Sequence, residues 1–429
     1  MPVPNGTDAV QRVVYDAQGT ETLPGARRRG EGEPAGPDQT VNEAYDGLGA
    51  TWTLYHDAFN RNSLDDKGLP LLASVHYGQD YDNAFWNGSQ MVFGDGDGDI
   101  FNRFTESVDV IGHELTHGVT EHTAGLTYSG QSGALNESVS DVFGSLVRQR
   151  TLGQTADQAD WLIGKGLFTA KVHGEALRNM EHPGTAYDDP VLGKDPQPDS
   201  MAGYLDTTED NGGVHTNSGI TNRAFVLVAK AIGGNAWEAP GQIWYDVLTG
   251  DISADCDFAT FAELTVAAAG ARFGQGSAQQ QAVQAAWTEV GVLDASSSGS
   301  PGAPDPKIAA TDALPDADPG DGDEDLELML LRTGGFAGQR RTRTVRVNDL
   351  PTPDADAWRD LLHSPRLAEF GQASSHPDAF SYQVRCPRHQ VDVSVPEPGL
   401  PTGVRDLFQR TLAFDPPGDQ ASGVGPAPE

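Results

Sequence analysis

The sequence predicts an α+β fold: a two-lobed region, β-rich in its first lobe and helical in its second, followed by a small α+β domain. Two changes along the sequence support this division. Near residue 106, short β-branched and aromatic runs give way to apolar residues at helical spacing. From residue 295 to residue 325, large apolar side chains almost disappear, and mixed strand and helix patterns resume beyond that stretch.

Residues 1–106 form the predicted β-rich N-terminal lobe. Its short runs of β-branched and aromatic residues, such as 72–77 and 90–93, are separated by Gly, Asp and Asn, which favour turns. We expect these runs to be strands.

Residues 107–294 form the predicted helical lobe. Its first apolar side chains share one face of a helix, because they are three or four residues apart: Val108, Ile111, Leu115 and Val119. The same spacing predicts further helices at 134–146, 220–231 and 258–271.

Residues 295–325 form a predicted linker, rich in Ser, Gly, Pro, Ala and Asp. Beyond it, residues 326–412 form a predicted small α+β domain, and the Pro/Gly-rich residues 413–429 form a predicted disordered tail. Within the small domain, the sequence predicts strands at 326–331, 342–347, 380–384 and 391–395 and a helix at 354–362.

The composition excludes some classes of partner. The 429 residues contain 28 Lys and Arg against 62 Asp and Glu, a formal net charge of -34. Because a nucleic-acid or anionic-membrane binder must neutralise phosphates, we expect neither partner. No stretch of about 18 apolar residues predicts a membrane span. The two cysteines, Cys256 and Cys386, do not imply a disulfide framework.

Residues 113–117 read His-Glu-Leu-Thr-His within the first predicted helix of the second lobe. His113 and His117 are four residues apart, so their imidazoles point the same way and can share one zinc ion. Glu114 lies about 100 degrees further round the helix, where its carboxylate can reach a water rather than the metal. The pattern predicts a hydrolytic metal site with Glu114 as the general base.

Catalytic zinc takes three protein ligands and keeps one position open, so a third ligand must come from elsewhere in the chain. Glu137 lies twenty positions after His117, in Gly-Ala-Leu-Asn-Glu-Ser-Val-Ser-Asp at 133–141, and is the predicted third ligand. Asp141, four residues beyond Glu137, and Asn136 beside it are predicted to orient the liganding imidazoles.

The sequence excludes two other classes of hydrolase, the metzincins and the enzymes with a serine nucleophile elbow. A metzincin needs Gly at position 120 and His at position 123, and both positions are Thr. A G-x-S-x-G nucleophile elbow needs Gly at position 134, which is Ala. A non-enzymatic protein with a structural metal site is the remaining alternative, and the intact Glu114 argues against it.

Together with Asp-Asn-Gly-Gly-Val-His-Thr-Asn-Ser-Gly-Ile at 210–220, these motifs resemble the thermolysin family of metallopeptidases. The segments 81–86 and 91–96 also match, so the resemblance covers roughly residues 10–292. Asp-Trp-Leu-Ile-Gly at 160–164 resembles the protealysin branch. The resemblance implies a thermolysin-like two-lobed fold and a zinc-dependent neutral endopeptidase that acts on peptide or protein substrates.

The resemblance also implies catalytic roles for matching residues. Glu114 would deprotonate the attacking water and pass the proton to the leaving amine. His215 and Tyr128 would donate hydrogen bonds to the oxyanion of the tetrahedral intermediate, and Asp210 would hold His215 in place.

Substrate-binding roles follow from the same resemblance. Asn83, Ala84 and Trp86 would belong to a strand that pairs with an extended substrate. Arg178 would bind the carbonyl group after the cut bond. Val110 and Leu177 would line the pocket beyond that bond, which implies a preference for a bulky apolar residue there.

The sequence departs from the family at its calcium sites. Many thermolysin relatives hold calcium with an acid eleven positions after the third zinc ligand, where this chain has Arg148, although Asp109 is retained. Residues 95–99 with Glu106 superficially resemble a calcium loop, but Ile100 occupies the position at which the tight turn needs Gly. We interpret 95–99 as a hairpin turn, and bound Ca2+ stays an open alternative.

Residues 326–412 resemble emfourin, a small protein inhibitor of protealysin-like enzymes, through Leu-Leu-Arg-Thr-Gly-Gly-Phe-Ala-Gly at 330–338 and the Arg-rich strand that follows. The net charge of this segment is +1, against -32 for residues 1–325. We hypothesise that the segment regulates the protease in cis, because a linker of about thirty residues gives an effective concentration of roughly millimolar. The alternative is an accessory or substrate-binding module.

The first thirty residues lack the basic start and apolar run of a secretory signal. The localisation therefore stays open between the cytoplasm and export by another route. Because the protease-like sequence begins within the first fifteen residues, we interpret the chain as truncated or as inhibited by something other than a prosegment.

Overall fold

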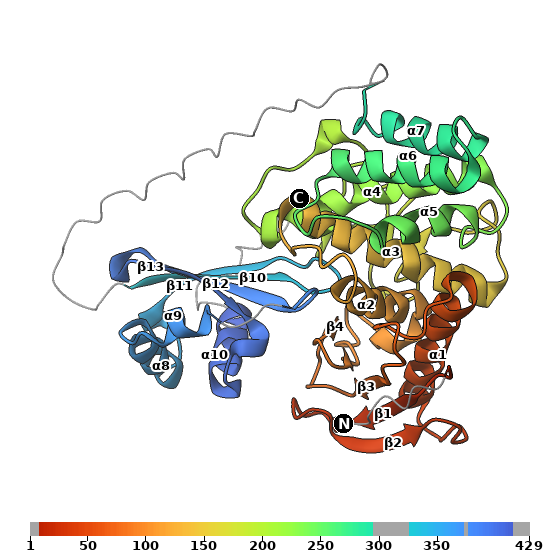
Figure 1. Ribbon diagram of the computed structural model, residues 1–429. Coiled ribbons are helices and arrows are strands. Elements are labelled where there is room, and N and C mark those ends of the chain that lie inside the picture. Colours follow the sequence, from red (N-terminus) through yellow and green to blue (C-terminus); the bar gives the residue numbers. More distant parts are fainter. Residues whose placement is uncertain (1–7, 295–325, 373–375, 415–429) are drawn as a thin grey trace, which may run out of the picture. The chain divides into compact units, whose positions relative to one another are not determined.

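The computed structural model describes residues 8–294, 326–372 and 376–414 (Figure 1). The predicted linker at 295–325 and residues 415–429 of the predicted tail lie outside the described residues. The chain divides into two units, each described here by itself. The first unit comprises Met1–Pro301 with two short later segments, Gly335–Gly338 and His376–Asp378, and the second comprises the remainder.

A five-stranded sheet forms the base of the N-terminal lobe in the first unit (Figure 1). The strand order is β2-β1-β3-β5-β4, with β1, β3 and β5 parallel and the two outer strands antiparallel to their neighbours. The strands are β1 (Arg12–Asp16), β2 (Ala26–Gly30), β3 (Leu71–Val75), β4 (Ala84–Trp86) and β5 (Met91–Phe93). Strand β4 is therefore an edge strand of this sheet.

The N-terminal lobe also contains a long helix, α1 (Gln39–Phe59), that the sequence analysis did not predict. The Asp38 side chain caps its N-terminus and accepts a hydrogen bond from the backbone N of Val41 at 3.3 Å. The buried Val41, Ala44 and Leu48 follow helical spacing. Asn, Asp and Gly, which have low helix propensity, lie between these residues and weaken the helical pattern in the sequence.

Six helices form most of the second lobe in the described residues, and the predicted helices at 134–146, 220–231 and 258–271 fall within three of them. They are α2 (Val108–Glu121), α3 (Gly130–Leu152), α4 (Asp210–Ile232), α5 (Ala239–Leu248), α6 (Phe258–Phe273) and α7 (Ala278–Glu289). Short strand pairs, β6 (Leu162–Ile163) with β7 (Arg178–Asn179) and β8 (Asp188–Asp189) with β9 (Gly193–Lys194), lie in the α3–α4 connection.

Helices α2 and α3 touch backbone to backbone at a glycine pair. A Cβ atom on Gly144 would lie 2.4 Å from the carbonyl oxygen of Asp109 and 3.0 Å from the backbone N of His113. A Cβ atom on Gly112 would lie 3.0 Å from the Cα of Gly144. Only residues without a side chain permit this approach, which holds the two helices at a fixed separation.

The second unit is a four-stranded antiparallel sheet with helices and a core of its own. The strand order is β11-β10-β12-β13, and the aromatic rings of Trp358 and Phe408 stack 5.0 Å apart within the core. Helices at 366–370 and 402–413 were not predicted. The elements are β10 (Glu327–Gly334), β11 (Arg341–Arg346), α8 (Thr352–Leu362), α9 (Arg366–Phe370), β12 (Phe380–Cys386), β13 (Val391–Pro396) and α10 (Thr402–Ala413).

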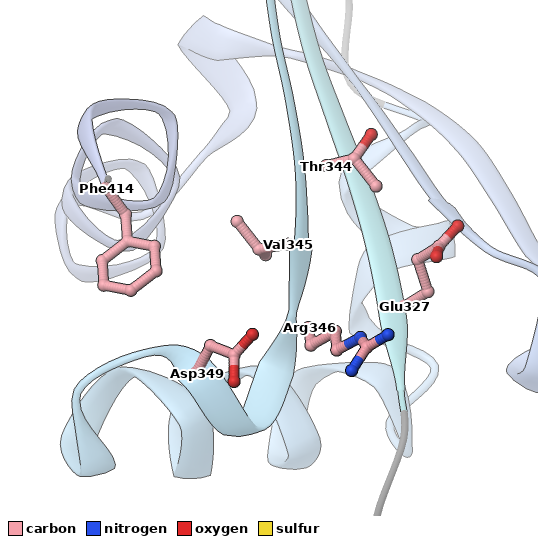
Figure 2. Close-up of a pocket in the computed structure, with 6 residues that line it drawn as sticks. All are labelled: Glu327, Thr344, Val345, Arg346, Asp349 and Phe414. Carbon is pink, nitrogen blue, oxygen red and sulfur yellow. The ribbon is translucent and has the colours of Figure 1, made fainter. Parts of the chain in front are cut away.

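The second unit has a pocket whose lining includes none of the predicted catalytic residues. Figure 2 shows its lining side chains, Glu327, Thr344, Val345, Arg346, Asp349 and Phe414, around a cavity of about 200 Å³. Among the described helices, none combines the length and apolar character that a membrane span requires.

Candidate active site

The predicted zinc ligands come together between α2 and α3. The Nε2 atoms of His113 and His117 are 3.1 Å apart. Carboxylate oxygens of Glu137 lie 3.5 Å from the first of these nitrogens and 3.6 Å from the second. All three side chains are buried. The four-residue spacing on α2 and the glycine contact between the helices thus place three ligand atoms around one point.

The hydrogen bonds of the two imidazoles favour a cation at that point. The Nδ1 atom of His113 faces a carboxylate oxygen of Asp141 at 2.8 Å, and the Nδ1 atom of His117 faces the side-chain oxygen of Asn136 at 2.8 Å. Because both partners are acceptors, each Nδ1 carries the proton and each Nε2 presents a lone pair. Two lone pairs and a carboxylate converge, and a cation removes their mutual repulsion.

The spacing of the ligand atoms fits zinc. A tetrahedral ion with bonds of about 2.0–2.1 Å places its ligand atoms about 3.3 Å apart. The observed separations of 3.1, 3.5 and 3.6 Å bracket that value. A His, His and Glu donor set is also one of the known sets of catalytic zinc sites.

A fourth residue, an aspartate, reaches the same point, and the sequence analysis missed it. The Oδ2 atom of Asp378 lies 3.0 Å from the Nε2 of His113 and 3.1 Å from the Nε2 of His117. The four ligand atoms lie within 4.8 Å of one another, and they form the one such group in residues 8–294, 326–372 and 376–414. Asp378 belongs to a short segment of the first unit, outside any motif or periodic pattern, so the sequence carried no signal for it.

Glu114 is held beside the ligands by the edge strand. One carboxylate oxygen accepts a hydrogen bond from the backbone N of Trp86 at 3.0 Å, and the other is buried and has no hydrogen-bond partner among the described residues. Burial and the neighbouring carboxylates of Asp378 and Glu137 raise the pKa of Glu114 well above its usual value. The geometry leaves one oxygen of the predicted base available to a proton donor.

Asp141 joins the metal site to the substrate side. Its carboxylate accepts hydrogen bonds from Arg178 at 2.8 and 2.6 Å and from Asn222 at 2.8 Å, besides its contact with His113. Burial alone would raise the pKa of Asp141, but the Arg178 guanidinium and His113 lower it well below its usual value. The carboxylate therefore stays ionised and holds both Arg178 and His113 in place.

The predicted oxyanion donors also converge. A kink of left-handed residues at 211–213 near the start of α4 lets Asp210 accept hydrogen bonds from both the backbone N and the ring Nδ1 of His215, at 3.0 and 2.7 Å. Tyr128 Oη lies 3.3 Å from the His215 Nε2 and 2.5 Å from Glu137. Burial alone would lower the pKa of His215, but the Asp210 and Glu137 carboxylates raise it well above its usual value. The imidazolium can donate from both nitrogens.

The predicted substrate-binding residues lie on or near strand β4 and in the core of the first unit. Ala84 and Trp86 lie on the edge strand β4, and Asn83 immediately precedes it. Val110 and Leu177 are buried in the hydrophobic core of the first unit. Edge strands pair readily with extended peptides, so this placement agrees with the predicted substrate strand.

The predicted substrate-binding groups are already engaged in this structure. Asn83 accepts a hydrogen bond from the backbone N of Phe336 at 2.8 Å and donates one to the backbone oxygen of Asp378 at 2.7 Å. Arg178 donates a hydrogen bond to the backbone oxygen of Phe336 at 2.6 Å. The Phe336 ring is fully buried, 4.8 Å from the imidazole of His113.

The residues near the predicted calcium positions pair with one another. Arg148 contacts both carboxylate oxygens of Asp160, at 2.6 and 3.0 Å, and its charge opposes the rise that burial causes in the pKa of Asp109. In the loop at 95–99, Asp97 accepts backbone hydrogen bonds from residues 99, 100 and 101, as in a tight turn. These contacts agree with the interpretation of 95–99 as a turn.

Comparison with known proteins supports the same family. Residues 10–121 match the family model "Thermolysin metallopeptidase, catalytic domain" and residues 124–292 match "Thermolysin metallopeptidase, alpha-helical domain". An "Extracellular metalloprotease" of Pectobacterium carotovorum is 58% identical over 282 residues, which are 66% of this chain and 81% of the relative. The chain belongs to the thermolysin family. It is thus a zinc metallopeptidase, as the sequence predicted.

Two further thermolysin-family proteins are close to this chain. "Protease PrtS" of Photorhabdus sp. is 52% identical over 67% of this chain and 77% of the relative. The solved precursor of protealysin from Serratia proteamaculans is 61% identical, with a TM-score of 0.66, over 66% of this chain and 88% of that chain. Outside the thermolysin-family region, residues 330–412 match the model "Emfourin". The recognised family, its protealysin-like branch and the emfourin-like segment are all confirmed.

Proposed function

We propose that this thermolysin-family enzyme is an endopeptidase that cuts peptide bonds before bulky apolar residues and is inhibited in cis by its emfourin-like segment. The catalytic part rests on one observation: three lone-pair ligands converge with a buried carboxylate, Glu114, beside them. Bound zinc supplies the Lewis acid that polarises the scissile carbonyl and acidifies a water.

The residues of the chain carry the remaining steps. His113, His117 and Glu137 hold the metal, and Asp141 and Asn136 fix the imidazoles that face it. Glu114 takes the proton of the attacking water and delivers it to the leaving amine.

Stabilisation of the intermediate falls to His215, Tyr128 and Asp210. His215, charged and held by Asp210, and Tyr128 donate hydrogen bonds to the developing oxyanion. Removal of one such donor costs about 3 to 4 kcal/mol of transition-state stabilisation.

Glu114→Gln tests the catalytic proposal, because it removes the base and keeps its size. We expect unchanged zinc content, measured by atomic absorption, with a loss of caseinolytic activity of at least about 1,000-fold. Equal activity of wild type and variant, or a wild type without zinc, would contradict the proposal. Glu263→Gln is the matched control, because Glu263 also lies on a helix of the second lobe, α6, and is exposed.

The specificity proposal rests on the family resemblance and on Val110 and Leu177, which are buried apolar residues. Mass spectrometry of a digested, unfolded protein gives the residues that follow each cut. We expect Leu, Phe, Ile and Val to dominate there. Preferential cutting before charged residues would contradict this part and leave the zinc chemistry intact.

The cis inhibition proposal is tested by deletion of residues 326–429. We expect the caseinolytic rate of the shortened chain to rise by at least about tenfold. An unchanged or lower rate would favour the alternative, in which the emfourin-like segment is a substrate-binding or accessory module.

A further inference from the structure

We propose that a pocket in the connection between α3 and α4, here called the lateral pocket, binds the part of a protein substrate that lies three or more residues after the cut bond and favours basic side chains there. This inference rests on the proposed function, because it assumes an endopeptidase. It extends the specificity beyond the apolar residue that directly follows the cut bond.

The lateral pocket has the size of a ligand site. Its volume is about 620 Å³, and ligand pockets usually have about 300 to 1,000 Å³. All of its lining residues belong to the α3–α4 connection. The polar side chains of the lining are those of His173, Glu175, Asn179, Thr185, Asp188 and Lys194, together with the hydroxyl of Tyr187.

The lateral pocket shares a wall with a cavity at the catalytic groups. Tyr187 lines the lateral pocket and also lines a second cavity, whose walls include Arg178 and His215. Asn179, in the lining of the lateral pocket, directly follows Arg178 in β7. Arg178 is the predicted binder of the carbonyl after the cut bond. A peptide that continues beyond that carbonyl, at about 3.3 Å per residue, therefore reaches the lateral pocket within a few residues.

One wall of the lateral pocket is fixed by a buried carboxylate. Asp195 accepts hydrogen bonds from the backbone N atoms of Gly184 and Ala186, at 3.0 and 3.1 Å, and from that of Gln197 at 3.0 Å. Gly184 and Ala186 both line the lateral pocket. Because this wall is held before a peptide arrives, little conformational entropy is lost when the peptide binds.

The hairpin of β8 and β9 forms another wall. Asp188 and Lys194, both lining residues, are partners in its antiparallel register. The buried Asp189 accepts hydrogen bonds from the backbone N of Val191 at 2.8 Å and from that of His173 at 2.9 Å. These bonds tie the turn of the hairpin to the segment that carries His173.

The turn of this hairpin presents an apolar side chain to solvent. Val191 is 77% exposed, which makes it the most exposed large apolar side chain of the described residues. Single exposed apolar residues are common, but this one lies at the end of a hairpin that lines a pocket and is held there by Asp189. A bound protein substrate that covers it removes apolar surface from water.

The charges of the lining favour a basic side chain in the substrate. Two acids, Glu175 and Asp188, line the lateral pocket against one base, Lys194. Residues 1–325 as a whole have a net charge of -32. Both the lining and the surrounding field attract Lys or Arg and repel Asp or Glu.

Paired peptides test the lateral pocket in the full-length chain. A short fluorogenic peptide ends two residues after the cut bond, and a long peptide adds two lysines. We expect kcat/KM of the long peptide to exceed that of the short peptide by at least about fivefold. The ratio is taken within one protein, so partial inhibition in cis cancels. A ratio near one in the wild type would overturn the proposal.

Variants locate the effect of the added lysines. Glu175→Gln should lower the ratio by at least about threefold and leave cleavage of the short peptide unchanged. Glu263→Gln, on α6, is the matched control for the loss of one exposed acid. Equal ratios in these two variants would assign the effect to the field of the whole unit and overturn the pocket.

The exposed apolar contact has its own pair of variants. Val191→Ser should lower the ratio by at least about twofold, because the substrate loses an apolar contact. Leu152→Ser is the matched control, since Leu152 is 55% exposed at the end of α3 and does not line the lateral pocket. Equal ratios in these two variants would exclude Val191 from the binding surface.

Binding without cleavage distinguishes this inference from the proposed function. Fluorescence anisotropy of the labelled peptide Leu-Ala-Lys-Lys gives its Kd for the full-length chain, and we expect at least about threefold weaker binding to Glu175→Gln than to Glu263→Gln. If this difference is found and no peptide is cleaved, the lateral pocket holds and the peptidase proposal fails. If the short peptide is cleaved but the two Kd values are equal, the peptidase proposal holds and the lateral pocket fails.

Discussion

Two arginine–aspartate pairs, each with one partner on helix α3, have the same chemistry and different surroundings. Arg178 and Asp141, beside the zinc ligands, have side chains only 5% and 0% exposed. Arg148 lies about two turns further along α3 than Asp141. The side chains of Arg148 and its partner Asp160 are 18% and 31% exposed. Water screens the second pair and not the first. The comparison teaches that the same contact distance of 2.6 Å has a different energetic weight at the two positions on α3.

The largest effect should come from breaking the buried pair. Asp141→Asn leaves the Arg178 charge buried without its partner, which costs about 3 to 5 kcal/mol of unfolding free energy. It also loosens His113, so we expect about 10 to 100-fold weaker zinc binding. Urea unfolding and competition with a chelator measure the two effects. Asp160→Asn, in the screened pair, should cost at most about 1 kcal/mol, and equal losses in the two variants would refute the comparison.

A smaller effect should follow from forcing α2 and α3 apart at their glycine contact. On α3, this contact lies between Asp141 and Arg148. Gly144→Ala forces a Cβ atom against the Asp109 carbonyl, and we expect a loss of about 2 to 3 kcal/mol in urea unfolding. Zinc affinity should fall as well, because His113 and Glu137 lie on opposite sides of this contact. Gly36→Ala is the control, since a Cβ there meets open space. A stable Gly144→Ala variant with normal zinc affinity would show that the contact does not position the ligands.

Reversal of the charge of Arg148 tests the role of the screened pair. Arg148→Glu places an acid near Asp109 and Asp160, and we expect a loss of about 1 to 2 kcal/mol in a calcium-free buffer. Added Ca2+ should restore part of this loss in the variant, because three acids can then bind it. The melting temperature of the wild type should not respond to Ca2+ or to EGTA. If the melting temperature of the wild type depended on Ca2+, the Arg148 guanidinium would not take the place of a bound calcium ion.

The smallest effect concerns a partly exposed pair whose charge can be switched. The hydrogen bond from His76 to Asp95, with a contribution from Asp38, raises the pKa of His76 to about 9. Because the folded-state pKa exceeds the unfolded value of about 6.5, this stabilisation is complete below pH 6.5 and is lost as the pH rises through 9. We expect wild type to lose about 1 kcal/mol more than His76→Gln between pH 6 and pH 10, after discounting for solvent screening. If the unfolding free energies of wild type and His76→Gln changed equally with pH, the His76–Asp95 pair would be excluded as the cause of the pH dependence.

The part of the site that could be predicted depends on local spacing. His113, Glu114 and His117 follow one turn of a helix, and Glu137 follows from the need for a third ligand and from the family motif. Such signals survive in a sequence because helical geometry fixes which residues share a face. Asp378 and Phe336 have no such signal, since they lie on loops 199 or more residues from the ligands. Only the folded chain brings them to the metal site.

The prediction of the fold also depended on local spacing. The sequence predicted the helical lobe and the four strands of the emfourin-like segment, because their apolar periodicity is strong. It missed α1, whose buried face is interrupted by poor helix formers, and it missed α9 and α10. The partner of Arg148 could not be predicted from the sequence. Residues 160–164 were noted only for their resemblance to the protealysin branch, and the structure shows Asp160 as the counter-ion.

The glycine contact between α2 and α3 has a consequence for how this enzyme can vary over evolution. The distance between the two ligand-bearing helices is set by main-chain atoms, which every sequence shares. Apolar side chains elsewhere in the hydrophobic interior can therefore be exchanged, one mutation at a time, without shifting the histidines relative to the glutamate. The contact requires glycine at positions 112 and 144 and leaves the surrounding positions free to change during evolution.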